Sequence, residues 1–216
     1  IAHSSTGATY SINQGSCGTF KRVRTKSKKD LEIDYERKRY TYMHGMKNYV
    51  WPLLEEIIKG DLTSESGLLN VIYGEAELFS GCEFNIRGKL GTSLFTPYVG
   101  VIDRTSGVIS VDIDPFVPAN MIAAPGGTTH FKIISAGAEI DFENESFIET
   151  HSESDILPWN QTTTAAINHV NTVTADSTKP LFLALGLEFY QEVNGQMYPL
   201  KNGAYNPLAL VQVSGL

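Results

Sequence analysis

A possible metal site is the first chemistry that the sequence offers. His151, Glu153 and Asp155 in the stretch HSESD would lie on one face of a strand, because side chains alternate between the two faces of a strand. Imidazole and carboxylate groups are ligands of zinc and calcium. Alternating polar residues are also what the solvent-facing side of any strand shows. We interpret the stretch as a polar strand face and expect no tightly bound metal ion or cofactor.

Calcium ligands and catalytic groups are similarly incomplete. The stretch DFENES offers Asp141, Glu143 and Glu145 at alternate positions, but it lacks the glycine and the twelfth-position glutamate of an EF-hand loop. The sequence has no G-x-S-x-G nucleophile elbow and no phosphate-binding loop. GSCG around Cys17 has no helix behind it to activate the thiol. We therefore expect a protein that is not an enzyme.

The stretch FKRVRTKSKK (residues 20–29) is strongly charged. Six of its ten residues are Lys or Arg, although the whole chain has a formal net charge of -7. Residues 1–60 contain 11 Lys and Arg against 6 Asp and Glu, giving +5. Residues 61–216 contain 6 against 18, giving -12. The two parts of the chain are therefore electrostatically complementary.

If this basic stretch is extended, neither of its faces is apolar enough to enter a core. One face would carry Phe20, Arg22, Arg24, Lys26 and Lys28, and the other Lys21, Val23, Thr25, Ser27 and Lys29. Such a strand resists casual pairing, but it can add to a sheet whose neighbouring side chains are acidic. We expect residues 1–29 to form an extended basic arm or weak hairpin that docks onto the acidic remainder of another copy.

Residues 30–75 have the spacing of a helical segment. Apolar and aromatic residues between Leu31 and Val50 recur at intervals of three, four and seven. Asp30 is a candidate N-cap, Pro52 should end or kink the helix, and Gly60 is a stop signal. We expect this helix to bury aromatic and methionine side chains against a partner: Tyr42, Met46, Tyr49 and Trp51.

Aromatic residues beside a basic stretch would also suit single-stranded nucleic acid. Tyrosines and methionines at helical spacing are, however, more often found in a core or an interface. The charge of residues 61–216 would oppose a polyanion unless the arm extended beyond a Debye length of about 8 Å. The sequence therefore argues against a nucleic-acid partner, which we keep as an alternative.

From residue 76 to residue 216, short alternating segments separated by turns replace the helical spacing. VISVDI (108–113) alternates apolar and mostly polar residues, and LFLALGLEFY (181–190) is apolar on both faces, as in a central strand. Asn194-Gly195 suits a two-residue hairpin turn. The pattern predicts a mainly β protein: an antiparallel β-sandwich of about seven strands, of the immunoglobulin or fibronectin type III kind, after the basic arm and the helical segment.

Several stretches of the strand-rich part resemble a known group of proteins. They are GCEFN (81–85), SVDIDPF (110–116), APGGTTHFKIISAGAEIDFE (124–143) and LGLEFYQEVNGQMYPLKNGAYNPLALVQV (185–213). Together with the basic stretch ahead of a helix, they are similar to a group of Bacteroidota proteins of about this length that has no established activity. The resemblance covers most of the chain. It implies a C-terminal sandwich similar to fibronectin type III or immunoglobulin domains, and no catalytic residues.

Ligand binding by the sandwich is a second candidate function. A glycan-binding site needs exposed aromatic rings beside amides and carboxylates. Trp159, Asn160 and Gln161 in LPWNQTTT form the candidate cluster. Trp159 could equally plug the end of the sandwich, so the sequence leaves both interpretations open.

The compartment also stays open. The apolar run at residues 181–187 is far shorter than the roughly 20 residues that a membrane-spanning helix needs, so we expect no membrane span and a soluble chain. The first residues lack a signal-peptide pattern, although a chain from which one was removed would look the same. Cys17 and Cys82 match no zinc pattern, and we expect buried thiols. The favoured function is a structural protein that self-associates into a homo-oligomer or larger assembly.

Overall fold

The computed structural model describes residues 8–13, 19–24, 76–142, 144 and 146–215. The first two segments are strands β1 (Ala8–Asn13) and β2 (Thr19–Arg24), which pair antiparallel in a two-stranded sheet of their own. Two segments of the expected basic arm are therefore strands. Residues 25–29 and the predicted helical segment lie outside the described residues.

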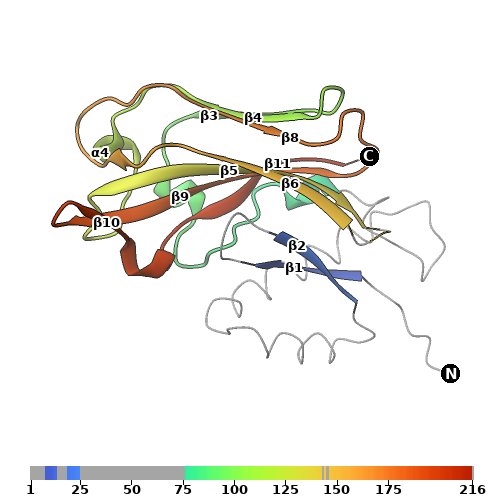
Figure 1. Cartoon of the computed structure of the whole chain (residues 1–216), viewed down its shortest axis with the longest axis horizontal. Helices are drawn as coiled ribbons and strands as arrows, with labels where there is room; N and C mark the ends of the chain where they lie inside the picture. The colour runs from blue at the N-terminus through green and yellow to red at the C-terminus, as the bar shows by residue number, and fades with distance from the viewer. Residues whose placement is uncertain (1–7, 14–18, 25–75, 143, 145, 216) are drawn as a thin grey trace.

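Strands between Tyr98 and Ser214 form two antiparallel sheets that pack face to face, with the smaller sheet uppermost in Figure 1. The smaller sheet has the order β3 (Tyr98–Asp103), β4 (Val108–Ile113), β8 (Ile167–Thr172). The larger sheet has the order β10 (Gln196–Pro199), β9 (Leu181–Val193), β5 (His130–Asp141), β6 (Ser146–Glu153). In addition, β11 (Leu208–Ser214) pairs with the first half of β9, and β7 (Leu157–Pro158) pairs with the start of β5.

The strand order is that of an immunoglobulin-like sandwich. If β3, β4 and β8 are lettered A, B and E, and β5, β6, β9 and β11 are lettered C, C′, F and G, the sheets are A-B-E and G-F-C-C′. Fibronectin type III domains share this sandwich architecture. The predicted antiparallel sandwich is therefore confirmed. It has nine strands rather than about seven, because the short strands β7 and β10 are added at the sheet margins.

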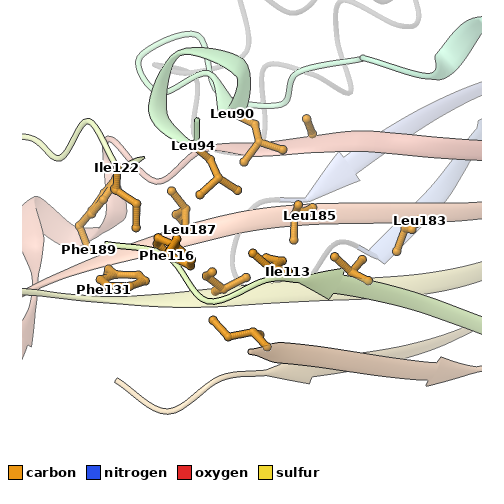
Figure 2. Packing of buried hydrophobic residues seen from close by; sticks show 14 of the residues in the cluster. Leu90, Leu94, Ile113, Phe116, Ile122, Phe131, Leu183, Leu185, Leu187 and Phe189 are labelled. Carbon is orange, nitrogen blue, oxygen red and sulfur yellow. The ribbon is translucent and has the colours of Figure 1, made fainter. Parts of the chain in front are cut away.

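The main core lies between the two sheets, because both sheets turn apolar alternate residues toward each other (Figure 2). Apolar residues at alternate positions of β4 and β9 are buried, as their sequence patterns predict. The core residues labelled in Figure 2 are Leu90, Leu94, Ile113, Phe116, Ile122, Phe131, Leu183, Leu185, Leu187 and Phe189. Strand β9 is buried on its other face as well, which confirms that it is a central strand.

A second apolar cluster covers the other face of the large sheet. Phe182 of β9 packs there with residues from β5, β11 and the segment that precedes the sandwich strands. Cys82 belongs to this cluster, and its thiol is buried and not in a disulfide, as expected; Cys17 lies outside the described residues. Burial, followed by the negative charge of Glu83, raises the pKa of the Cys82 thiol to about 11.

The helices of the described residues are single turns. They are η1 (Ala76–Phe79), α3 (Leu90–Ser93), α4 (Pro118–Met121) and η2 (Leu200–Gly203). In the described part of the chain, no helix is both long enough and apolar enough to cross a membrane.

The turn between β3 and β4 is fastened to the far end of the large sheet by Arg104. Its guanidinium donates hydrogen bonds to the carbonyl oxygens of Ser177 (2.7 Å), Lys179 (2.8 Å) and Gly215 (2.6 Å). It also donates to the carbonyl and hydroxyl oxygens of Ser214. A planar group with five N–H donors suits several fixed acceptors at once. Arg104 thus holds the end of β3 in place over β11.

Candidate interaction surface

One margin of the sandwich is closed by side chains that take the place of a strand partner. Ser152 Oγ of β6 donates a hydrogen bond to the Val170 carbonyl oxygen of β8 (2.7 Å). Thr150 Oγ1 accepts one from the Thr172 amide (3.0 Å) and donates one to the Thr172 carbonyl oxygen (3.2 Å). The edge of β8 is therefore occupied by β6, and a further strand could not pair there over these residues.

The margin at β11 is also covered. The amide of Gly81 donates to the Leu210 carbonyl oxygen (2.7 Å), and the Leu210 amide donates to the Cys82 carbonyl oxygen (2.9 Å). The neighbouring edge strand β10 has only four residues and ends in Pro199. Short length and proline are both features that discourage pairing between sheet edges.

Strand β3 is an open edge. It pairs with β4 on one side, and no strand in the described part of the chain pairs with its other side. Its six residues, YVGVID, include no Lys, Arg or Pro. An exposed edge strand without these features is a template for the addition of another strand. β3 can lie close over the large sheet because Gly100 has no side chain. A Cβ at this position would lie 2.8 Å from Leu183 Cδ2.

The outer face of the smaller sheet carries apolar side chains next to this edge. The exposed fractions are 60% for Val99, 44% for Val101 and 58% for Val170. The register places Val101 of β3 opposite Ser110 of β4, and Ser110 opposite Val170 of β8. We call Val99, Val101 and Val170 the valine face. It exposes aliphatic side chains to solvent and is therefore a candidate contact for another molecule.

The charges on this sheet are negative. Its three strands contain Asp103 and Asp112 and no Lys or Arg. Asp112 accepts a hydrogen bond from Asn168 Nδ2 (2.6 Å), and Asp103 accepts one from Ser106 Oγ (2.6 Å). The hydrogen bonds from Ser106 are the main cause that lowers the pKa of the Asp103 carboxyl. The Asp103 carboxylate beside the open edge is therefore ionised at neutral pH.

A buried polar cluster lies between the sheets. Ser135 Oγ of β5 is 3.0 Å from His169 Nδ1 of β8 and accepts a hydrogen bond from Asn171 Nδ2 (3.1 Å). All three residues are buried, and Gly137 makes room for Asn171 because a side chain there would meet its Cβ at 3.0 Å. A Ser–His pair could activate a hydroxyl, but Ser135 is fully buried, so no substrate can reach it.

The residues of the possible metal site do not form one. His151 and Glu153 share the outer face of β6, as the sequence predicts, but Asp155 lies beyond the end of the strand. Glu153 pairs with Lys132 Nζ at 3.1 Å. No group of three His, Cys, Asp or Glu side chains that could hold a metal ion occurs among the residues described. The expectation of a protein without metal or cofactor stays a prediction.

The second acidic stretch connects β5 to β6 in the chain, and Asp141 and Asn144 are among its described residues. Asp141 accepts hydrogen bonds from the amide and the side chain of Asn144, and it lies 3.0 Å from Lys179 Nζ. Hydrogen bonds from Asn144, with a smaller contribution from Lys179, lower the pKa of the Asp141 carboxyl. Glu143 and Glu145 lie outside the described residues.

In the candidate glycan cluster, the ring of Trp159 is part of the packed sandwich. Trp159 Nε1 donates a hydrogen bond to the Ile122 carbonyl oxygen (3.1 Å), and the ring packs against the main core. Asn160 Oδ1 accepts a hydrogen bond from the Thr162 amide (2.8 Å), and Gln161 is exposed. The sandwich-plug interpretation of Trp159 agrees with this geometry, and ligand binding stays an untested alternative.

The expected partner-binding residues are only partly within the described chain. Phe20, Lys21, Arg22 and Arg24 belong to strand β2. Those outside the described residues are Lys26, Lys28, Lys29, Tyr42, Met46, Tyr49 and Trp51. Their role in self-association stays a prediction.

Sequence reasoning missed the open edge and the buried polar cluster. The pattern of INHVNT (167–172) predicts a face with Ile167, His169 and Asn171, and this face is indeed buried. That alternation was a usable signal for a buried histidine. No comparable signal marks β3 as an edge, because edge position depends on how distant strands are arranged.

Comparison with protein-family models, curated proteins and solved structures gives no match. The resemblance to the Bacteroidota group stays a prediction.

Proposed function

We propose that the protein is a non-enzymatic structural component that self-associates, with the basic N-terminal arm of one copy docking onto the acidic sandwich of another. The observation that carries the proposal is the smaller sheet, which combines an open edge, an exposed valine face and only negative charge. Residues 76–216 contain 6 Lys and Arg against 15 Asp and Glu, giving -9. Opposite charge favours encounter and register, and apolar burial supplies affinity.

The test is the mass of the protein in solution with and without the arm. Deletion of residues 1–29 should lower the mass to that of a single copy, measured by sedimentation at equal concentration. A matched variant keeps the arm but replaces the six Lys and Arg of residues 20–29 by Gln. This variant should associate more weakly than the intact chain and more strongly than the deletion, because it loses charge and keeps the main chain.

The same samples separate the alternatives. An unchanged mass after deletion would refute docking through the arm. If the intact chain is a single copy but retains single-stranded DNA or RNA through residues 20–29, the nucleic-acid alternative replaces the proposal. Binding of glycans that is lost with Trp159→Ala but kept in the deletion would favour the ligand-binding sandwich.

A further inference from the structure

Strands β3, β6, β8, β10 and β11 border the two sheets, and β3 is the border strand that combines an open edge with the length of β2 and the valine face beside it. The margin at β8 is occupied by Thr150 and Ser152, and β11 is covered by residues 81–84. The edge of β10 is short and contains a proline. β6 also has no strand on its outer side among the described strands, but its eight residues exceed the six of β2. β3 has six residues, like β2, and no strand on its outer side within the described chain.

We infer that the open edge of β3 in one copy accepts strand β2 of a second copy as an added antiparallel strand. This inference rests on the proposed function and names the receptor surface. The smaller sheet would then grow by two strands, because β2 brings β1 with it. Main-chain hydrogen bonds would supply binding, and side-chain pairs would set the register.

The two strands match in length and in charge. β2 (TFKRVR) and β3 (YVGVID) have six residues each. β2 contains three Lys and Arg and no acid, whereas the strands of the smaller sheet contain two Asp and no Lys or Arg. Opposite charges on neighbouring strands stabilise pairing, while like charges oppose it. A second copy of β3 therefore fits this edge less well than β2 does.

The hairpin also needs a sheet to join. A two-stranded sheet is marginally stable in water, and three or more strands with an apolar face are needed for stability. Within one chain β2 pairs only with β1 among the described strands. Addition to β3 would place the hairpin at the end of a five-stranded sheet, next to the valine face.

One antiparallel register brings together both kinds of favourable pair. If Val23 lies opposite Val101, Lys21 lies opposite Asp103, because antiparallel partners keep a constant sum of residue numbers. The first pair covers exposed aliphatic surface at Val101, and the second pairs opposite charges. Cα atoms of opposite residues in antiparallel strands are about 4.5 to 5.5 Å apart, which is within the range of a disulfide.

Cysteine cross-linking tests this register between separate copies. Two full-length variants, Val23→Cys and Val101→Cys, are made with Cys17→Ser in both, and one carries a mass tag. Oxidation of the mixture should give tagged–untagged dimers in high yield. Val170→Cys is the matched control, because its side chain is at least as exposed as that of Val101 on the same face but would lie three strand spacings from β2, about 14 Å. Equal yields from Val101→Cys and Val170→Cys, or no mixed dimer, would overturn the inference.

Adding a charge of either sign at Val101 gives a second test that does not depend on disulfides. Val101→Lys should weaken association roughly tenfold, since it sets a cation against the basic strand, whereas Val101→Glu should not. Val170→Lys is the control for a charge elsewhere on the valine face. Urea midpoints equal to that of the intact chain verify that the variants fold. If deletion of residues 1–29 abolishes association but Val101→Lys leaves it intact, the proposed function stands and the β3 receptor is wrong.

Discussion

His169 is a buried histidine, and its surroundings differ from those of a histidine on the surface. It lies in the core between the sheets, and among the described residues Nε2 has no hydrogen-bond partner. Burial lowers the pKa of the imidazole, and the negative charge of Glu153 opposes this in part. The folded sandwich therefore favours the neutral form of the His169 imidazole.

This environment predicts acid sensitivity. The unfolded chain binds a proton on His169 near the ordinary pKa of about 6.5, whereas the folded chain binds it only at lower pH, so stability falls as pH drops through 6.5. His169→Gln should reduce the slope of unfolding free energy against pH by up to about 1.4 kcal/mol per pH unit below pH 6.5. Urea unfolding between pH 7.5 and 5 measures the slope.

The control for this experiment is His151→Gln, which changes an exposed histidine on β6. It should leave the slope as in the intact chain. Equal slopes for His169→Gln and the intact chain would mean that His169 is protonated in the fold at little cost.

At the scale of elements, two hairpin turns rely on glycine to different degrees. Gly195 (φ 76°) follows Asn194 (φ 51°) between β9 and β10, as the sequence predicts, and nothing lies within 4 Å of the position a Cβ would take. Gly107 (φ 72°) ends the turn between β3 and β4, and a Cβ there would lie 2.5 Å from the Val173 carbonyl oxygen. Gly107 is therefore required for two reasons, its positive φ and the lack of space for a Cβ, whereas Gly195 is required for its positive φ alone.

The two glycines should respond differently to the same substitution. Gly195→Ala should destabilise by about 1 kcal/mol through the positive φ alone. Gly107→Ala should cost at least about 2 kcal/mol, because the loop that contains Val173 must also move. Chemical denaturation of both variants provides the comparison. Equal losses would mean that the loop yields without resistance.

At the scale of the molecule, charge separates the two parts of the chain. The basic residues are concentrated before residue 60, and the sandwich is acidic. Each exposed ion pair contributes only about 0 to 1 kcal/mol, so several pairs together with apolar contact are needed for a stable assembly.

Association should therefore weaken with salt without vanishing. Raising ionic strength from 0.1 M to 1 M shortens the Debye length from about 10 Å to about 3 Å. The average mass in sedimentation should fall over this range for the intact chain. The variant with six Gln in residues 20–29 serves as control and should show little dependence on salt. A salt-independent mass for the intact chain would mean that charge attraction contributes little to the association.

The sequence by itself determined the strands of the sandwich and several of their faces. The alternation in residues 108–113 predicts a strand with one apolar and one polar face, and the two-sided apolar pattern of residues 181–190 predicts a central strand. Both predictions are confirmed. Asn194-Gly195 predicts the hairpin turn between β9 and β10, because both residues readily adopt the positive φ that such a turn needs. These features follow from side-chain periodicity and turn conformation, which depend on neighbours in the sequence.

Only the tertiary structure decided which strand edge is open and which polar residues meet in the core. Thr150 and Ser152 reach the main chain of β8 about 20 positions away, and residues 81–84 cover an edge more than 120 positions away. Ser135, His169 and Asn171 meet because two sheets pack face to face. Such contacts join residues distant in the chain, and local periodicity carries no information about their pairing.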